Sequence, residues 1–556
     1  MNSSESDGTL PSRLAGIAEE RPEVSATFWS LRQSLSYADL HARSVEAAAA
    51  LVRRGVRRGE PVGILSPNAP EFLIGLFAVT AAGGAAAPLP LPSGAQQLRS
   101  YPQRLAAIAA ASGMRSILVS PRLAGPVAAL TGAVDVEFID TTTLFDEHDD
   151  PVTLPAVGPG DPAIVQFTSG STAAPKGVLL THRNALAGLA AIRRGIALDR
   201  TDQGGFWLPL FHDMGLFGTL SAILRGIPAH LWSPTSFVKD PARWLREFAE
   251  AGVTITAMPS FGYQALLDAV PADRATEYDL RHWRIAFNGA EPISQPVVRE
   301  FCARFGPAGF APTTMFGVYG MAEATLAVTF PPLHREPHFE WVDREPLGRS
   351  GRAVPVPPGS PGARAIAGVG YPVAGMRLRL VEPESGLDVL DGTVGEILLR
   401  GDSVTGGYLT ADPDVADRLF TDGWLRTGDL GYRRDGELFI TGRLKEMITV
   451  RGENHYALDI EAAVEGLDGI YRGRCIAVAD PERDAMAVVV ETDRTAAEAD
   501  ALTEAVRARI TAELGLAGVR VYPVPPRTIP RTSSGKLQRL AARELISNGS
   551  VALPLS

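Results

Sequence analysis

Residues 168–177 read Thr168-Ser-Gly-Ser-Thr-Ala-Ala-Pro-Lys-Gly177, a run of small hydroxylated residues and glycines with a single lysine. Segment 163–167, just before it, is short and apolar, as in a buried strand. Beyond the run, segment 184–192 follows Thr181 and has the leucine spacing of a buried helix face. The sequence therefore predicts a strand, a loop and a helix in succession, which is the geometry of a phosphate cradle.

The residue types in this loop suit an anionic ligand. Gly170 and Gly177 permit positive φ and close approach, so several N–H groups can converge on one anion. Lys176 adds a mobile positive charge that suits a polyphosphate. The hydroxyl donors of the loop are Ser169, Ser171 and Thr172. Pro175 occupies the place of a Walker A glycine, so the loop is not of that type. A polar surface turn stays open as an alternative.

Composition narrows the classes of partner. The chain has 556 residues, 45% of them hydrophobic, so it can bury a large core in several domains. Its formal net charge of −10 disfavours general binding to nucleic acid or anionic membranes. The polar segment 1–8 lacks the features of an export signal, and Gly83, Gly84 and several prolines interrupt the apolar stretch that begins at Phe72. We therefore expect a cytoplasmic protein without a transmembrane segment.

Alternating strand and helix patterns give the fold class. Ser36-Tyr-Ala-Asp39 reads as a capping box that opens a helix running to Leu51. Strands are predicted at 61–66 and up to Pro88, with a helix at 70–82 between them, and the alternation continues to about residue 140. This pattern predicts an α/β fold with doubly wound, mainly parallel sheets.

The alternation resumes at the phosphate loop and continues through three short apolar runs, 205–210, 254–258 and 283–287. In open α/β sheets, ligands bind beyond the carboxyl ends of the strands. The segments that follow these runs are therefore candidates for the site, namely 211–215, 259–262 and 288–291.

The remaining sequence has three different characters. Segment 331–368 is rich in proline and arginine and has the look of an insertion, whereas 369–442 alternates short strands with turns. Residues 443–556 have a strand and helix pattern of their own. We predict a large N-terminal domain, 1–442, of doubly wound sheets plus a small β subdomain, followed by a small α+β C-terminal domain, 443–556.

Four further motifs follow the loop in order: Val318-Tyr-Gly-Met-Ala-Glu323, Thr427-Gly-Asp429, Gly442-Arg-Leu-Lys445 and Pro530-Arg-Thr-Ser-Ser-Gly-Lys536. With these motifs, the chain resembles the adenylate-forming superfamily of acyl-CoA synthetases, peptide-synthetase adenylation domains and firefly luciferase. The resemblance covers nearly the whole chain, and the five ordered motifs together are far more specific than any one of them.

Within that superfamily, the chain is most similar to fatty acyl-AMP ligases. The likeness rests on Leu208-Pro-Leu-Phe-His-Asp-Met-Gly-Leu216, Tyr319-Gly-Met-Ala-Glu-Ala-Thr-Leu326 and Arg451-Gly-Glu-Asn-His-Tyr-Ala-Leu-Asp-Ile-Glu461. In these ligases, an insertion like 331–368 packs between the large domain and a mobile C-terminal domain, and it disfavours the posture needed for CoA. The sequence departs slightly from the pattern of these ligases, with Phe211 where they commonly have tyrosine and Ala457 where they commonly have proline.

The resemblance implies attack of a carboxylate on the α-phosphate of ATP, giving acyl-AMP and pyrophosphate with Mg²⁺. Three catalytic residues are implied: Lys176 for the β- and γ-phosphates, Lys536 for the carboxylate and α-phosphate, and Glu323 for Mg²⁺. Lys445 is implied as the hinge of the C-terminal domain. From the residues alone, an alternative stays open for each of two residues. For Lys536 it is an exposed lysine near a frayed terminus, and for Glu323 it is a surface glutamate.

The same resemblance implies the nucleotide site. Tyr319 offers a flat face to adenine, next to room left by 289–291, and Asp429 and Arg443 hold the ribose. A core tyrosine, a turn aspartate and a surface ion pair stay open as alternatives for these three residues. The implied ATP- or AMP-binding set is Thr168, Ser169, Gly170, Ser171, Thr172, Lys176, Gly289, Ala290, Glu291, Tyr319, Gly320, Met321, Ala322, Asp429 and Arg443.

Five residues are candidates for the pocket that holds an acyl tail: His212, Met214, Gly215, Phe261 and Gly262. All of them would equally suit an ordinary core. We do not expect proton transfer by His212, because a fatty acid is already ionised at neutral pH.

We predict a stand-alone fatty acyl-AMP ligase that passes its acyl group to the phosphopantetheine arm of a separate acyl carrier protein, in polyketide or lipopeptide assembly. A separate carrier is expected because the chain contains no Asp-Ser-Leu carrier motif. Two alternatives stay open. One is a fatty acyl-CoA ligase with the same first step, and the other is a non-catalytic acyl- or nucleotide-binding protein, against which the presence of Lys176, Glu323, Asp429 and Lys536 counts.

Overall fold

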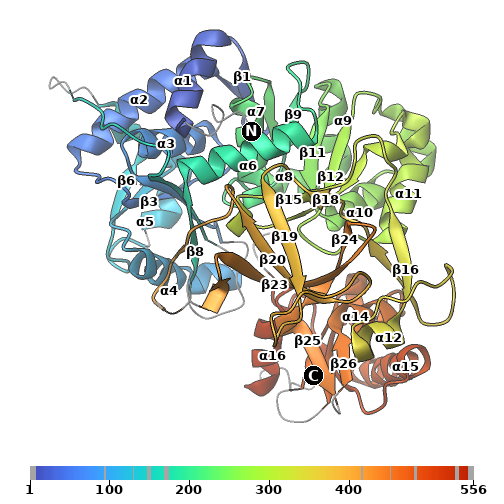
Figure 1. Cartoon of the computed structure of the whole chain (residues 1–556). Coiled ribbons are helices and arrows are strands. Elements are labelled where there is room, and N and C mark those ends of the chain that lie inside the picture. The colour runs from blue at the N-terminus through green and yellow to red at the C-terminus, as the bar shows by residue number, and fades with distance from the viewer. Residues whose placement is uncertain are drawn as a thin grey trace.

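A computed structural model describes residues 8–92, 95–128, 130–146, 152–167, 175–412, 414, 418–450, 453–480, 485–531 and 537–548. Two seven-stranded sheets, each flanked by helices, form the larger part of the molecule, and the C-terminal elements lie below them in Figure 1. The predicted fold class is thus confirmed.

The first sheet is built mainly from the first 181 residues. Its strands, from one edge to the other, are β21 (Tyr408–Leu409), β8 (Gly177–Thr181), β7 (Pro162–Phe167), β4 (Ala85–Pro88), β3 (Pro61–Leu65), β5 (Ser116–Val119) and β6 (Glu137–Asp140). Strands β7, β4, β3, β5 and β6 run parallel, whereas β8 and β21 are antiparallel to their neighbours. The helices of this part are α1 (Leu10–Glu20), α2 (Tyr37–Arg53), α3 (Pro70–Ala81), α4 (Ala95–Ser112) and α5 (Ala124–Ala128).

One strand of this sheet, β8, was not predicted from the sequence. The loop at 168–177 is followed by strand β8 and not by a helix, so it connects two antiparallel strands of a hairpin. Residues 177–181 extend because β8 pairs with β7 on one side and with β21 on the other. The predicted helix over 184–192 is present as α6 (His182–Gly195), and Thr181 and Asn184 form a reciprocal capping box at its start.

The second sheet brings residues 25–36 beside strands from the middle of the chain. Its order is β13 (Met315–Gly317), β12 (Ile285–Asn288), β11 (Ile255–Met258), β9 (Gly204–Phe206), β10 (Ala229–Leu231), β1 (Ser25–Phe28) and β2 (Gln33–Ser36). Only β2 is antiparallel to its neighbour. The accompanying helices are α7 (Asp213–Ile223), α8 (Pro234–Lys239), α9 (Pro241–Glu250), α10 (Ser260–Ala269) and α11 (Gln295–Phe305).

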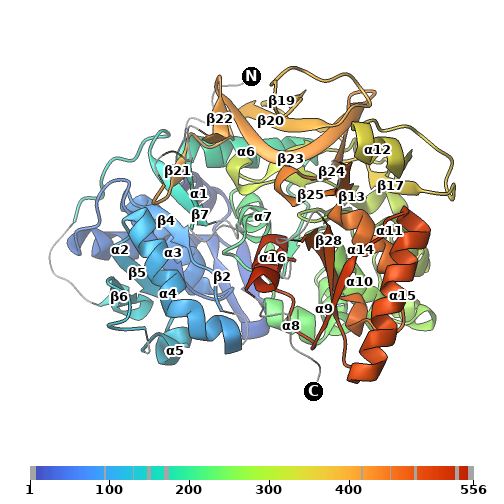
Figure 2. The same cartoon turned by 90° about the horizontal axis from the view of Figure 1, so that it is seen from below.

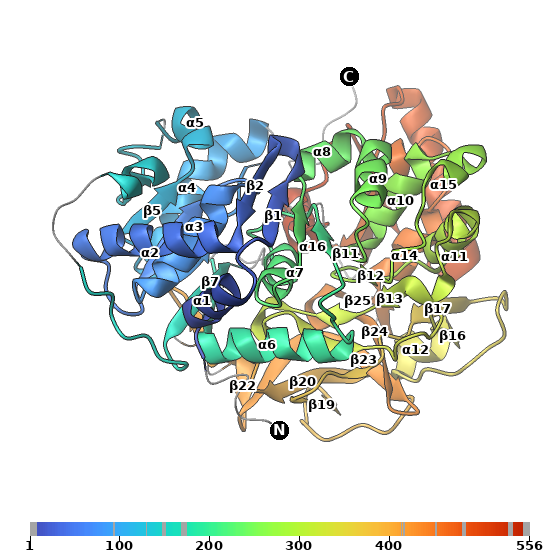
Figure 3. The same cartoon turned by 90° about the horizontal axis from the view of Figure 1, so that it is seen from above.

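Helix α6 joins the two halves. It packs against β7 and β8 of the first sheet and against α7, which lies next to β9 and β11 of the second. Figure 3 shows α6 running across the molecule, with α7 between the two groups of helices. A single large apolar core therefore extends through both sheets.

The predicted insertion, 331–368, contains regular secondary structure. Residues 339–367 contain a two-stranded sheet, β16 (Phe339–Asp343) with β17 (Ala363–Ala367), and the short helix α12 (Arg344–Ser350). A small sheet next to it consists of β14 (Tyr319–Gly320), β15 (Ala327–Phe330) and β18 (Tyr371–Pro372). The β-rich segment forms a five-stranded sheet of β19 (Met376–Val381), β20 (Gly395–Gly401), β23 (Trp424–Arg434), β22 (Phe420–Thr421) and β24 (Glu437–Arg443).

The C-terminal segment has apolar clusters of its own, made of buried residues between 448 and 546. Its elements are β25 (Met447–Val450), β26 (Glu453–Tyr456), α14 (Ala457–Val464), β27 (Cys475–Ala479), β28 (Met486–Glu491), α15 (Ala496–Leu514), β29 (Arg520–Val524) and α16 (Arg539–Ser547). Figure 2 shows α14, α15 and α16 around this sheet. In the described residues, no helix combines the length and the apolar character needed to cross a bilayer.

Candidate active site

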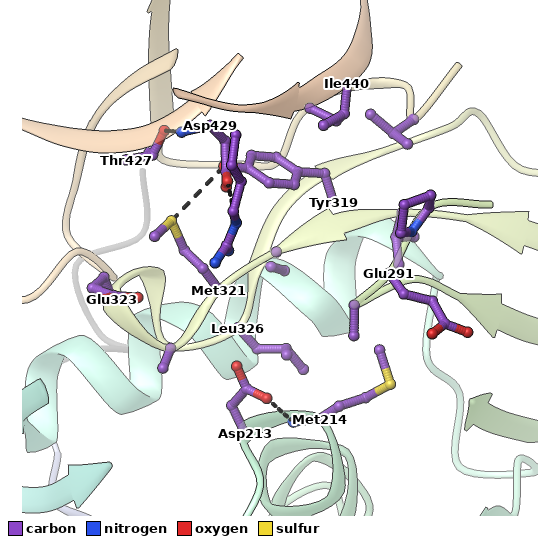
Figure 4. Close-up of a pocket in the computed structure, with 18 of the residues that line it drawn as sticks. Asp213, Met214, Glu291, Tyr319, Met321, Glu323, Leu326, Thr427, Asp429 and Ile440 are labelled. Atoms are coloured by element: carbon purple, nitrogen blue, oxygen red, sulfur yellow. Dashed lines mark hydrogen bonds and ion pairs between the residues drawn. The ribbon is translucent and has the colours of Figure 1, made fainter. Parts of the chain in front are cut away.

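A cavity of about 990 Å³ lies between the N-terminal sheets and the C-terminal segment. Its walls come from α7, from residues 318–327, from the β23–β24 pair and from residues 537–540. Figure 4 shows Tyr319 and Asp429 on one side of this space, Asp213 and Met214 on the other, and Glu323 and Glu291 at opposite ends. Three sequence motifs that lie far apart in the chain thus meet in one place.

Tyr319, Asp429 and Arg443 form a hydrogen-bonded group. The Tyr319 hydroxyl donates to Asp429 Oδ2 at 2.7 Å, and Arg443 Nε lies 2.8 Å from Oδ1. Strand register explains the second contact, because Asp429 on β23 is paired with Arg443 on β24. Burial, and then the Asp429 charge, raises the pKa of Tyr319 well above its usual range, so the phenol stays protonated.

A carboxylate offers about four lone-pair sites, and these contacts occupy two of them. Asp429, which lines the cavity, therefore keeps the capacity to accept further hydrogen bonds. Two vicinal hydroxyls of a ribose are a fitting pair of donors for it.

Glu323 is the carboxylate at one end of the cavity. The Tyr408 hydroxyl donates to its Oε1 at 3.2 Å, and its backbone carbonyl accepts from Thr405 N at 2.8 Å. Burial raises the pKa of Glu323, and the nearby Asp213 carboxylate adds to the rise. Two carboxylates that face one cavity in this way favour a cation between or near them.

Thr325, two residues after Glu323, has a structural role. It adopts a left-handed φ of 67°, and its hydroxyl lies 3.1 Å from Asn184 O and 2.9 Å from Ser403 O. The threonine therefore links its own turn to α6 and to the β-rich segment.

Lys176 lies at the cavity together with Lys445 and Arg418. Burial is the main reason that the pKa of Lys176 is lowered, and repulsion from Lys445 and Arg418 lowers it further. Only four lysines occur in the chain, against a Lys and Arg total of 53, so a compact ammonium group is a rare choice in this sequence. Lys176, Lys445 and Arg418, the last of which pairs with Asp412, give this part of the cavity positive charge that suits a ligand with several negative charges.

Six predicted residues cannot be placed. Lys536 and the loop residues Thr168, Ser169, Gly170, Ser171 and Thr172 lie outside the described residues. Leu537, Gln538 and Arg539, which directly follow Lys536, do line the cavity. Arg539 Nη2 lies 2.6 Å from Glu461 Oε2, and its Nη1 lies 2.6 Å from Glu446 Oε2, next to the predicted hinge Lys445.

Segment 289–291 lines the cavity only in part. Gly289 does not contribute to the wall, but a β-carbon there would lie 2.8 Å from Val318 O, so close packing requires glycine. Ala290 lines the cavity with a left-handed φ of 66°. Glu291 also lines it, while its Oε1 accepts from Phe261 N at 2.8 Å near the start of α10. Gly320, Met321 and Ala322 belong to the wall as well.

Three of the five predicted tail-pocket residues do not line the cavity. Gly215 packs against the loop before α7, where a β-carbon would lie 2.4 Å from Pro209 O. Phe261 stacks edge-on against Trp207, and Gly262 packs on Met258. His212 and Met214 do line the cavity.

The apolar part of the cavity extends instead between α6, α7 and the strands β9 and β11. The residues that line it include Ile192, Ile196, Leu198, Phe206, Ala222, Ile227 and Ile255. They come from segments far apart in the sequence, and each one resembles an ordinary core residue. No sequence signal separated them from the core.

Sequence reasoning also missed several polar residues at the cavity, among them Tyr408 and Arg418. Asp213 lies in the predicted site segment 211–215, although the sequence assigned no role to it, and it stands in the first turn of α7. Tyr408 and Arg418 come from the β-rich segment and lie outside its one motif, Thr427-Gly-Asp429.

The predicted insertion, 331–368, contacts the C-terminal segment beside the cavity. Arg364 of β17 donates to Thr441 O at 2.8 Å, lies 3.2 Å from Asp459 Oδ1 of α14, and stacks over the Tyr456 ring. Arg344 lies 3.8 Å from the same carboxylate. A buried apolar cluster spans the same junction, with Val342, Leu347, Ala353, Ile366, Tyr432, Phe439 and Tyr456.

Comparison with known proteins agrees with this geometry. Residues 14–409 match the family model described as AMP-binding enzyme, and residues 445–550 match one described as Disco-interacting protein 2-like, AMP domain. A relative from Caulobacter vibrioides, which carries the provisional name of an acyl-CoA synthetase, is 34% identical over 94% of this chain and 92% of its own.

Two further relatives have more specific names. A medium-chain-fatty-acid–[acyl-carrier-protein] ligase of Teredinibacter turnerae is 31% identical over 98% of this chain and 94% of its own. A solved structure from work on fatty acyl-adenylate ligases of E. coli and L. pneumophila has a TM-score of 0.92 and 31% identity, covering 99% of this chain and 100% of that one.

The fold and the cavity define an adenylate-forming enzyme. The chain belongs to the AMP-binding enzyme family, and among its relatives are fatty acyl-AMP and fatty acyl-carrier ligases, which confirms the predicted family.

Proposed function

We propose that this protein activates a fatty acid with ATP to acyl-AMP and pyrophosphate, and then passes the acyl group to the phosphopantetheine arm of a separate acyl carrier protein. The observation that carries this proposal is the single cavity, polar where Tyr319, Asp429 and Lys176 lie and apolar where it enters the core. A fatty acid and a nucleotide can meet only in a site with both characters.

The nucleotide end has groups for each part of ATP. Asp429 and Arg443 are suited to the ribose, Tyr319 to the adenine, and Lys176 with the loop 168–172 to the β- and γ-phosphates. Because a carboxylate must approach a phosphate, the site needs positive charge where the two anions meet. We assign that part to Lys536, since the residues that follow it line the cavity.

Glu323 fits a Mg²⁺ ion. In the described residues, no group of three or more His, Cys, Asp and Glu side chains is arranged to hold a metal. Such a sparse site suits Mg²⁺, which keeps water and phosphate oxygens as most of its ligands and needs only one or two carboxylates. When bound, the ion would neutralise charge on the phosphates, and Glu323 would hold it with Asp213 nearby.

A carrier protein is proposed as the acyl acceptor, in keeping with the name of the Teredinibacter turnerae relative. Polyketide or lipopeptide assembly is the expected setting, and the cytoplasm is the expected compartment because ATP is the co-substrate. We further propose that the C-terminal domain, 443–556, is mobile about Lys445. Its separate apolar clusters support a unit that can move as a body.

A fatty acyl-CoA ligase is the second candidate, favoured by the name of the Caulobacter vibrioides relative. The contacts of Arg364 and Arg344 with Asp459 favour carrier loading, because they hold the C-terminal segment against the insertion.

A product assay separates these functions. The enzyme is incubated with ATP, Mg²⁺ and a panel of fatty acids, and acyl-AMP, acyl-CoA and acyl-carrier are resolved by mass spectrometry after addition of CoA or a phosphopantetheinylated carrier. We expect acyl-AMP that transfers to the carrier and not to CoA. Ready acyl-CoA formation would select the second candidate, and absence of adenylate with every acid would leave a binding protein.

A further inference from the structure

The apolar part of the cavity is a tunnel that runs along the strands of the second sheet. Gly204 on β9 is level with Ile255 at the start of β11, so both lie at the amino ends of their strands, whereas the nucleotide residues lie beyond the carboxyl ends. Ile196, Leu198 and Ile227, which line this far end, are 1%, 6% and 1% exposed. The tunnel is therefore walled off from solvent there.

Helix α7 gives the tunnel one smooth face. Met214, Gly218, Ser221 and Ala222 line the cavity with the spacing of a single helix face. The Ser221 hydroxyl donates to Phe217 O of its own helix at 2.7 Å, so its polar group is satisfied. An acyl tail meets an apolar surface along this helix.

The ring of Phe206 packs against Gly204 and Gly218 of this tunnel, and we call this space between the two glycines the seat of the ring. A β-carbon on Gly204 would lie 2.9 Å from Phe206 Cε2, and one on Gly218 would lie 2.8 Å from Cε1. The ring thus folds back over Gly204, toward the walled end, and rests on α7. Phe206, Gly204 and Gly218 all line the cavity.

We propose that Phe206, held in this seat by Gly204 and Gly218, is the side chain that limits the length of the acyl tail. The inference rests on the proposed function and deepens it. A tail that enters from the nucleotide end meets the ring before it reaches the space beside Gly204 and Ile255. A methyl group added at Gly218 displaces the ring or itself enters the tunnel, and a smaller residue at 206 frees the far end.

The test compares kcat/KM for adenylation over a series of straight-chain acids. For Gly218→Ala, we expect the longest acid accepted by the wild type to lose about tenfold or more relative to an acid two carbons shorter, because one methylene in an apolar pocket is worth about 10–200-fold. For Phe206→Ala and the milder Phe206→Leu, we expect the preferred length to increase and longer acids to become substrates.

Gly205→Ala is the matched control. It lies on the same strand, and its β-carbon would lie 2.7 Å from Val253 Cγ1, but it faces away from the tunnel. We expect its length preference to equal that of the wild type. Where Phe206→Ala or Gly218→Ala fails to fold, Phe206→Leu decides.

An unchanged length preference in folded, active Phe206→Leu would overturn the role of Phe206 alone. A wild-type enzyme that adenylates no acid would instead overturn the proposed function as well.

Discussion

The Tyr319 hydroxyl donates a 2.7 Å hydrogen bond to Asp429 Oδ2, across 110 residues of sequence. The contact joins the residue proposed for the adenine to the residue proposed for the ribose. Asp429 is only 4% exposed, so its position is set by protein contacts before any ligand binds. This pre-organisation is the basis of the first prediction.

Replacing Asp429 by Ala should lower kcat/KM for ATP by about 10–100-fold, because hydrogen bonds to a charged group are each worth about 1.5–3 kcal/mol. Tyr319→Phe keeps the ring face and removes only the hydroxyl, so a smaller loss is expected. ATP–pyrophosphate exchange measures both. Equal losses in the two variants would contradict a direct contact between Asp429 and the ribose.

Replacing Glu323 by Gln should raise the Mg²⁺ concentration for half-maximal activity by on the order of tenfold or more, since even indirect metal partners are worth that much. Burial raises the pKa of Glu323, so the wild type should lose Mg²⁺ affinity as pH falls through this raised pKa, at a higher pH than an ordinary glutamate. A Mg²⁺ titration at several pH values checks both points. Tyr408→Phe, which keeps the carboxylate, serves as the milder control.

The lowered pKa of Lys176 predicts an alkaline limit. The lysine must be charged to hold phosphates, so kcat/KM for ATP should fall as pH rises through a pKa below the ordinary 10.5. Arg418→Gln removes one charge that repels the Lys176 ammonium, so it should move this alkaline fall in kcat/KM to higher pH, whatever its effect on the maximal rate.

Two controls accompany this pH profile. Lys176→Ala should remove the alkaline fall in kcat/KM together with most of the activity. Lys239→Ala, at an exposed position on α8, should change neither the pH profile nor the activity. An alkaline fall that stays in place in Arg418→Gln would assign it to another group.

Asp459→Asn should increase acyl-CoA formation. The buried carboxylate lies next to Arg364 and Arg344 of the predicted insertion, and we expect its loss to weaken this contact by about 1–2 kcal/mol, or roughly 5–30-fold. Arg349→Ala is the matched control, because the Arg349–Glu453 pair joins the same two parts but is exposed and contributes little. Unchanged CoA turnover in an Asp459→Asn enzyme that still makes acyl-AMP would show that this contact does not block CoA.

Local signals predicted the individual elements well. The helix after Ser36, the strand from Pro61 and the helix from Pro70 lie close to where the sequence placed them, since capping and hydrophobic spacing act within a few residues. Strand β8 was missed because its extended form depends on pairing with β7 across the loop and with β21, more than 200 residues later. The β-propensity of a segment does not show which distant strand it will pair with.

The site shows the same division. Motif residues such as Glu323 and Asp429 were found because their order along the chain carries information. The tunnel was not found, because Phe206 and Ile255 differ from core residues only in facing a cavity. Gly215 was assigned to that tunnel, but it serves the close approach of α7 to Pro209.

The walled end of the tunnel has a kinetic consequence. For a tail that enters from the nucleotide end, past Tyr319 and Asp429, a nucleotide bound there would stand in its way. The fatty acid should therefore bind first and ATP second, and pyrophosphate should leave before the acyl group does. Steady-state initial rates should follow an ordered scheme, in which an unreactive ATP analogue is competitive with ATP and uncompetitive with the acid.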